Sequence, residues 1–219
     1  MGTTIAYIDG FNLYYGICAA GLRRYLWLDL ARLAEWLADP GDCLVTTHYF
    51  TAMVKHDPAD SSKQKRQESY VNAIRATGSV QIRLGRYAPV LRRCPHGHVY
   101  TSYVEKFSDV RLACQMLEDA RTGACDAFLL VSGDGDLAEP VRIIGRQYPG
   151  KRITVAFPPK RTSKEFHRLQ SAIPLKLRHI SHTELKARHL PQAVSGTGGE
   201  KYLRPPPWTY RTVTPPAPP

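Results

Sequence analysis

Residues 127–131 read Ala-Phe-Leu-Leu-Val, and Ser-Gly-Asp-Gly-Asp follows directly at residues 132–136. A strand without polar positions is typical of a parallel sheet that is buried on both faces. Residues 4–8 form another short apolar run, which ends in Asp9-Gly10. Because parallel strands need crossover connections, usually helices, the sequence predicts an α/β protein with a mainly parallel central sheet.

Helical and strand-like segments alternate along most of the chain. Residues 109–121 give the clearest helix, since their apolar positions keep a 3.6-residue period and Ser108 precedes them as a candidate N-cap. Residues 88–103 are expected to form a hairpin-like insertion. The other expected helices are residues 12–19, 29–38, 61–77, 137–148, 164–170 and 182–189, and the other expected strands are residues 44–52, 80–87, 152–157 and 176–180.

The length of 219 residues suits one such domain with a tail. We expect the domain to cover residues 1–190. Gly, Pro, Ser and Thr dominate after that, so residues 191–219 are predicted to be a disordered, Pro-rich tail. No apolar run approaches the roughly 20 residues that cross a bilayer, and the N-terminus is too short and uncharged for a signal peptide. We therefore expect no membrane association and a cytoplasmic location.

Basic residues are concentrated in two segments. Residues 55–93 carry a net charge of +6 and residues 151–189 one of +8, whereas the whole chain carries +11, so the remainder is mildly acidic. Basic segments attract a polyanion and hold its backbone. This distribution favours a nucleic-acid partner, although Lys and Arg can also serve only to solvate a protein surface.

Four aspartates are expected to meet at one edge of the sheet. Asp9 follows the first strand, and Asp134 and Asp136 follow the strand at 127–131. The carboxyl ends of parallel strands share one edge, where ligands bind. Asp109, in the first turn of its helix, can reach the same crevice. Clustered carboxylates repel one another, and Mg²⁺ or Mn²⁺ relieves that conflict because these ions prefer oxygen ligands.

Two other interpretations of these aspartates stay open at this point. Gly-Asp-Gly-Asp after a strand can be only a turn with helix-capping aspartates. A phosphotransferase or phosphatase with Asp9 as covalent nucleophile is less favoured, because Phe11-Asn12 occupies the positions where such enzymes usually place a second Asp.

Three segments resemble the motifs of a known family. Residues 8–14 (Ile-Asp-Gly-Phe-Asn-Leu-Tyr), 105–110 (Glu-Lys-Phe-Ser-Asp-Val) and 130–137 (Leu-Val-Ser-Gly-Asp-Gly-Asp-Leu) resemble, in order and spacing, the motifs of NYN-domain proteins, a branch of the PIN-like nuclease superfamily. The resemblance implies a PIN-like Rossmannoid three-layer sandwich and Mg²⁺- or Mn²⁺-dependent hydrolysis of RNA. It makes Asp9, Asp109, Asp134 and Asp136 the metal-site residues, with Asn12 and Ser132 orienting water, metal or phosphate.

RNA is therefore the expected partner, and a homo-oligomer is compatible with the sequence. Tyr14, Tyr15, Tyr87 and Tyr103 are candidates for stacking on bases. Glu105 or Lys106 is a candidate for supporting the metal site. The basic residues expected to contact RNA are Lys106, Arg86, Arg92, Arg93, Lys160, Arg161 and Lys164.

Two alternatives concern function. The chain can instead be a non-catalytic RNA-binding or scaffolding domain with the same fold; such a domain often lacks an acidic position, and none of the four is missing here. Cys94, His96 and His98 offer three zinc ligands within five residues, but a structural zinc site needs a fourth. A basic hairpin that contacts phosphate is the preferred interpretation of that segment.

Overall fold

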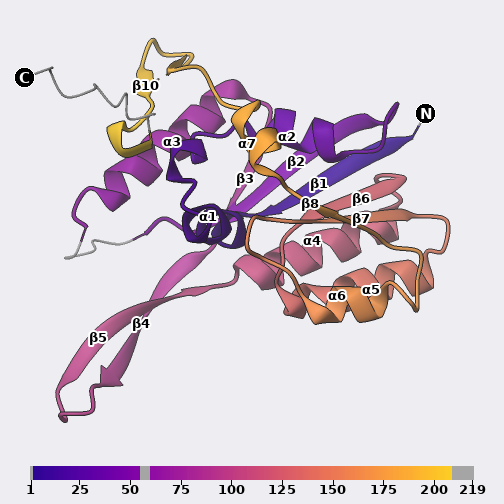
Figure 1. Ribbon diagram of the computed structural model, residues 1–219, viewed down its shortest axis with the longest axis horizontal. Helices are drawn as coiled ribbons and strands as arrows, with labels where there is room; N and C mark the ends of the chain where they lie inside the picture. Colours follow the sequence, from indigo (N-terminus) through magenta and orange to yellow (C-terminus); the bar gives the residue numbers. More distant parts are fainter. Residues whose placement is uncertain (1, 55–59, 209–219) are drawn as a thin grey trace, which may run out of the picture.

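The computed structural model describes residues 2–54 and 60–208. Its centre is a six-stranded sheet in the order β3-β2-β1-β6-β7-β8, and every neighbouring pair is parallel. Helices cover both faces of this sheet (Figure 1). The predicted α/β three-layer class is confirmed. The strands of the sheet are β1 (Thr3–Asp9), β2 (Cys43–Thr51), β3 (Gln81–Leu84), β6 (Ala127–Val131), β7 (Arg152–Phe157) and β8 (Lys176–His179).

Alternate side chains of the central strands point to opposite faces of the sheet. Ala6 and Ile8 of β1 pack into one core cluster, which lies toward α1, α2 and α3, whereas Ile5 and Tyr7 pack into a second cluster toward α4, α5 and α6. This alternation follows from the two-residue period of a strand. Because helices cover both faces, a central strand such as β6 is buried throughout and has no polar residue. The helices are α1 (Gly10–Ala19), α2 (Leu30–Leu37), α3 (Lys63–Thr77), α4 (Ser108–Thr122), α5 (Ala138–Gln147), α6 (Lys164–Leu169) and α7 (His182–Lys186).

A two-stranded hairpin projects from the body of the protein between β3 and α4 (Figure 1). Its strands, β4 (Arg86–Arg93) and β5 (Val99–Lys106), are antiparallel and pair from Arg86 with Lys106 to Arg93 with Val99. The hairpin is therefore longer than the predicted insertion at 88–103. The single strand predicted at 80–87 is also divided, because the chain leaves the sheet at Gly85, where a Cβ would lie 2.6 Å from Glu105 Oε1.

The tail predicted to be disordered from residue 191 is ordered up to Trp208, so this prediction is wrong over residues 191–208. Strands β9 (Ala193–Ser195) and β10 (Lys201–Leu203) pair with each other and lie against α3. A short 3-10 helix, Pro206–Trp208, follows. Trp208 is buried, with its ring centroid 5.9 Å from that of Tyr70. Composition predicted disorder, but one large aromatic side chain buries enough area to hold the segment.

Residues 209–219, the rest of the predicted tail, lie outside the described residues. Two other 3-10 turns, Arg23–Tyr25 and Gly135–Leu137, connect elements of the main domain. Within the described part of the chain, no helix has both the length and the hydropathy that crossing a bilayer requires.

Candidate active site

Asp9 is a buried carboxylate at the carboxyl end of β1, with 5% of its surface exposed. Oδ1 accepts a hydrogen bond from the backbone N–H of Asn12 at 3.0 Å, so Asp9 caps α1. Oδ2 accepts a hydrogen bond from Ser132 Oγ at 2.8 Å. Burial raises the pKa of Asp9, and the bonds from Asn12 and Ser132 oppose that rise. The carboxylate is thus held in one orientation by groups from two strand ends.

The loop after β6 is joined to Asp9 by a second set of bonds. Ser132 Oγ accepts from the backbone N–H of Asp134 at 3.0 Å, and Asn12 Oδ1 accepts from that of Gly133 at 2.9 Å. Asp134 Oδ1 in turn accepts from the N–H of Asp136 at 3.0 Å and caps the 3-10 turn. The capping interpretation of this motif is therefore true, but capping does not account for the position of Asp134 beside Asp9.

Asp109 approaches the same place from the first turn of α4. Partial desolvation raises its pKa to about 6, helped by the negative charges of Asp9, Asp134, Glu105 and Asp136. Asp109 is nevertheless an exposed residue. One side of its carboxylate is therefore in contact with water, while the other faces the acidic cluster. The charges of the other three aspartates therefore all act on Asp109.

Glu105 determines how α4 begins. Its Oε1 accepts from the backbone N–H of Ser108 at 3.0 Å and from Ser108 Oγ at 2.6 Å. The predicted N-cap, Ser108, is wrong: Ser108 is the first helical residue, and Phe107 holds the cap position with a φ of 81°. Glu105 replaces the cap because it lies near the end of β5, three residues before Ser108, with its carboxylate directed at the N–H of Ser108.

An open cleft of about 420 Å³ contains most of these groups. Asp9, Asn12, Asp109 and Asp134 line it, whereas Ser132 lies fully buried behind Asp9. Asp136 is exposed and does not line the cleft, so the structure separates it from the other three aspartates. The cleft is also lined by Phe11, Tyr15, Tyr87, Arg92, Ser102, Tyr103, Val104, Glu105 and Arg161.

The carboxylate oxygens are of the kind that binds a divalent cation, but in this structure they lie too far apart to hold one together. Their oxygens are the ligands that Mg²⁺ and Mn²⁺ prefer, and partial desolvation together with the negative charges of the neighbouring carboxylates raises the pKa of Asp109. Over residues 2–54 and 60–208, however, no three His, Cys, Asp or Glu side chains lie close enough together to hold a metal ion. Binding would require the side chains of Asp9, Asp109 and Asp134 to draw together.

Some of the basic residues expected to contact RNA line the cleft, and the others lie outside it. Arg92, from the hairpin, and Arg161, from the loop after β7, line the cleft. Arg161 Nε is buried and has no hydrogen-bond partner. Arg86 lies with its guanidinium 4.9 Å from the Phe107 ring. The remaining four, Lys106, Arg93, Lys160 and Lys164, are exposed outside the cleft lining.

Aromatic rings border the acidic groups on one side. Phe11 stacks on Tyr15 at 6.4 Å between centroids and meets the edge of Tyr87 at 6.3 Å. Phe11 had no part in the expected site, although Tyr15 lies four residues further along the same helix; its other ring neighbour, Tyr87, comes from a distant segment and leaves no local pattern. Tyr103 lines the cleft as well, whereas Tyr14 lines a different cavity.

Cys94, His96 and His98 lie at the turn of the projecting hairpin. The turn is closed by backbone bonds between Cys94 and His98 and between Gly97 and Cys94, each of 2.9 Å. Both histidines are exposed, and this trio belongs to no metal-holding group among the described residues.

The geometry and the family comparison agree on the class of protein. The NYN domain family matches residues 3–175, and the chain belongs to this family, which is part of the PIN-like nuclease superfamily. The chain is 30% identical, over 88% of its length and 72% of the relative's, to a Pseudomonas putida protein named 6-hydroxy-3-succinoylpyridine 3-monooxygenase HspA. A crystal structure of a Vibrio parahaemolyticus protein of unknown function covers 83% of this chain and 94% of that one, with a TM-score of 0.54 and 22% identity. The last similarity shows the fold alone.

Proposed function

We propose that this protein is a Mg²⁺- or Mn²⁺-dependent ribonuclease that hydrolyses RNA phosphodiester bonds in the acidic cleft. The observation that carries the proposal is the meeting of Asp9, Asp109 and Asp134, from three separate elements, in one cleft that Arg161 and Arg92 also line. Membership of the NYN family, whose members are generally nuclease-like, supports the same activity.

Asp9, Asp109 and Asp134 would hold the cation, and Asp136 would act on it through its charge. When bound, such an ion polarises a phosphoryl oxygen and activates water. Ser132 and Asn12 keep Asp9 and the loop after β6 in place through the bonds described above. Arg161 and Arg92 would bind the phosphate, and the Phe11–Tyr15 stack would receive bases.

Cleavage of a fluorescent single-stranded RNA in the presence of Mn²⁺ tests the proposal. Asp9→Asn and Asp134→Asn should abolish cleavage while RNA binding is largely retained, because each loses a metal ligand and no phosphate contact. Glu139→Gln is the matched control, since Glu139 is exposed and forms an ion pair with Arg142 on α5. Full activity of Asp134→Asn, prepared free of contaminating ribonuclease, would defeat the assignment.

Metal binding can be measured without activity. Mn²⁺ should raise the unfolding temperature of the wild-type protein, because a ligand that binds only the folded state stabilises it. Asp9→Asn should respond less, and Glu139→Gln should respond as the wild type does. RNA binding without cleavage, together with no response to Mn²⁺, would support the non-catalytic RNA-binding alternative.

The name of the Pseudomonas putida relative supports a second candidate function, hydroxylation of a pyridine ring. A monooxygenase places one oxygen atom of O₂ on its substrate and reduces the other to water with two electrons from a reductant. Incubation with 6-hydroxy-3-succinoylpyridine, O₂ and reduced nicotinamide separates the two functions. A hydroxylated product that depends on the protein, with intact RNA in the parallel assay, would favour the second candidate.

A further inference from the structure

Four exposed basic side chains lie around the base of the projecting hairpin. They come from the edge strand β3, from the first residue pair of the hairpin and from the first turn of α4. We call them the basic patch: Arg83, Arg86, Lys106 and Arg111. Within the described part of the chain, none of the four lines the acidic cleft.

Contacts between neighbouring elements bring the basic patch together. Arg86 and Lys106 are directly opposite each other in the register of the hairpin. The guanidinium of Arg111 donates to Leu84 O, which joins the start of α4 to the end of β3. Arg83 and Arg111 line one open groove of about 360 Å³ between these two elements. The patch therefore extends from the base of the hairpin into this groove.

The hairpin separates the basic patch from the acidic cleft. Tyr87 and Glu105, which are opposite each other in the register, both line the cleft. Arg86 and Lys106 form the adjacent pair. Because successive side chains of a strand point to opposite faces, this pair lies on the other face of the hairpin base.

The same separation holds on α4. Asp109 lines the cleft, whereas Arg111 lines the groove. Two residues correspond to about 200° of rotation around a helix, so these two side chains leave opposite sides of α4. The cleft and the basic patch therefore lie back to back across the base of the hairpin and the first turn of the helix.

The positive charge of the patch is available to a ligand. Arg83 donates from one nitrogen to Gln81 Oε1 at 3.1 Å, and a guanidinium has further donors. Glu118 also lines the groove, but its carboxylate forms an ion pair with Arg121 at 2.6 Å. A polyanion would therefore meet four cations and one carboxylate that is already compensated.

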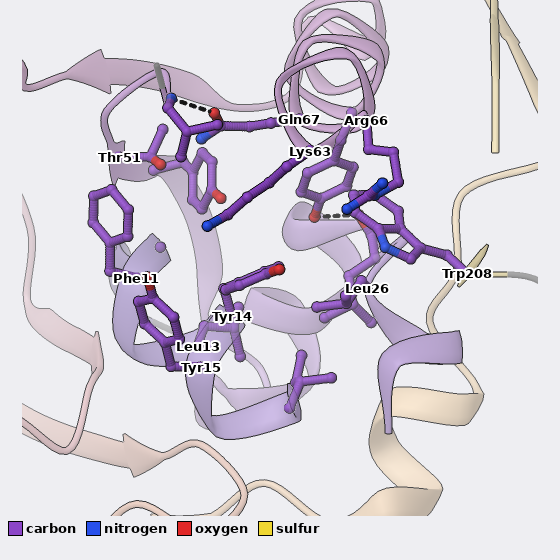
Figure 2. Close-up of a pocket in the computed structure, with 16 residues that line it drawn as sticks. Phe11, Leu13, Tyr14, Tyr15, Leu26, Thr51, Lys63, Arg66, Gln67 and Trp208 are labelled. Carbon is purple, nitrogen blue, oxygen red and sulfur yellow. Dashed lines mark hydrogen bonds between the residues drawn. The ribbon is translucent and has the colours of Figure 1, made fainter. Parts of the chain in front are cut away.

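An exposed ring lies beside the functional groups on each side of the hairpin base. On the cleft side, the Phe11 and Tyr15 rings stack on α1, at the edge of a small inner cavity of about 60 Å³ (Figure 2). On the patch side, Phe107 is 45% exposed, and its ring lies 4.9 Å from the Arg86 guanidinium. Cations beside exposed rings are the combination with which proteins hold single-stranded nucleic acid. This combination favours RNA over an acidic peptide.

We propose that the basic patch is a second RNA-binding surface, which holds the backbone of a single strand whose other part lies in the acidic cleft. The inference rests on the proposed function in one respect, that RNA is the ligand of the cleft. Only the hairpin base separates the two surfaces, and a flexible single strand can pass around it. One ligand that occupies two sites gains affinity, so RNA that is long enough to reach both should be the preferred substrate.

Fluorescence anisotropy without divalent ions measures this binding separately from cleavage. The Asp134→Asn protein serves as the background, because it is not expected to cut the probe. The probes are unstructured RNAs of about 6 and about 24 nucleotides. Arg83→Met combined with Arg86→Met removes two charges of the patch. Arg75→Met combined with Arg146→Met is the matched control, because both positions are exposed, on α3 and α5.

The patch variant should bind the long RNA at least roughly fivefold more weakly than the control variant does. The slope of log affinity against log salt should fall by about 1.4, since each phosphate contact of a single strand contributes about 0.7. The short RNA should lose less affinity, because it does not reach both surfaces at once. Thermal unfolding checks that both double variants are folded.

Three results would overturn the inference. The first is an equal affinity and salt slope of the patch variant and the control for the long RNA. The second is an equal loss of affinity for both RNA lengths, since one strand would then not span the two surfaces. The third is binding of polyglutamate that the patch variant loses while its RNA binding is unchanged, which would assign the patch to an acidic protein.

Cleavage of the long RNA by the wild-type protein with Mn²⁺ is measured in parallel. Cleavage without an effect of the patch variant on binding would leave the proposed function standing and reject the second surface. An effect of the patch variant on binding without any cleavage would support the second surface and reject the ribonuclease activity.

Discussion

Ser132 donates its hydroxyl hydrogen to Oδ2 of Asp9 across 2.8 Å, which joins two residues that are 123 positions apart in the chain. Both side chains are buried, and the same hydroxyl accepts the backbone N–H of Asp134. One side chain therefore fixes the carboxylate at the end of β1 and the loop that carries Asp134. Ser132 is buried behind the cleft and does not line it. The effect of replacing Ser132 can therefore be measured on the stability of the protein as well as on its activity.

Ser132→Ala should destabilise the protein by about 1–3 kcal/mol, because it leaves a buried carboxylate oxygen and a backbone N–H without their partner. The pKa of Asp9 should rise further, since the bond from Ser132 opposes the effect of burial. Urea unfolding measures the first effect. Ser171→Ala, which removes an exposed hydroxyl bonded to Arg168 O, is the control and should change stability little. Equal stability of the two variants would contradict the assigned role.

Asp109 should make the metal-free protein less stable as pH rises. Its pKa is about 6 in the folded protein and has an ordinary value of 3.8, so the folded state binds more protons between these values. Stability is highest below pH 4 with respect to this group and falls as pH rises to 6. Asp109→Asn removes the charge and should stabilise the protein at pH 8 by about 1 kcal/mol, after allowance for solvent screening.

Thermal unfolding in a metal chelator across pH 4–8 measures this effect. Glu118→Gln, on the exposed face of the same helix, is the control because its carboxylate forms an exposed ion pair with Arg121. An Asp109→Asn protein whose stability keeps the wild-type dependence on pH would show that the acidic cluster does not repel Asp109.

Phe107→Gly should stabilise the protein. Phe107 has a φ of 81°, in the left-handed region that costs a side-chain-bearing residue about 1–2 kcal/mol. Glycine removes that strain but loses the contact of the ring with Arg86, so the expected gain is about 0.5–1 kcal/mol. Phe107→Ala keeps the strain and loses the same contact, and should be less stable than wild type. Denaturant unfolding of the pair decides the matter, and equal stability of the glycine and alanine variants would reject the strain argument.

Arg161 should contribute to RNA affinity rather than to stability. Its Nε is buried without a hydrogen-bond partner, and the side chain lines the acidic cleft. Arg161→Met should weaken RNA binding and lower the slope of log affinity against log salt by about 1, because one phosphate contact is lost. Arg121→Met is the control, since Arg121 is exposed and paired with Glu118. Fluorescence anisotropy without divalent ions measures both, and an unchanged salt slope for Arg161→Met would count against a phosphate contact.

Trp208 should be a stabilising residue of the domain. Its ring packs against Tyr70 and Trp27, and its backbone oxygen accepts from Arg204 Nε at 2.9 Å. Trp208→Ala should destabilise the protein by about 3 kcal/mol, as expected for a large buried ring. Chemical unfolding measures the loss, and a stability equal to wild type would restore the original view of this segment as a disordered tail. Trp36→Ala is the control, because Trp36 is 51% exposed.

The local pattern of residues was sufficient to predict the sheet and the meeting of its acidic residues. The apolar run at 127–131 and the run before Asp9 are typical of strands buried in a parallel sheet, and neighbouring parallel strands present their carboxyl ends at one edge. The convergence of Asp9 and Asp134 was predicted from this rule alone, whereas that of Asp109 also used its place in the first turn of a helix. Asp136, two residues from Asp134, follows the 3-10 turn away from the cleft, which spacing alone does not reveal.

Tertiary contacts decided the rest. Glu105 accepts from the N–H of Ser108 only three positions further on, so this contact is local; what the residue pattern did not reveal is the left-handed conformation of Phe107 between them. The Pro-rich composition after residue 190 predicted disorder. Trp208 instead packs against Trp27 and Tyr70, which are more than a hundred positions away in the chain, and this contact orders the segment. Periodicity reports which face of an element is buried, but the partner that covers this face is chosen by packing across the whole chain.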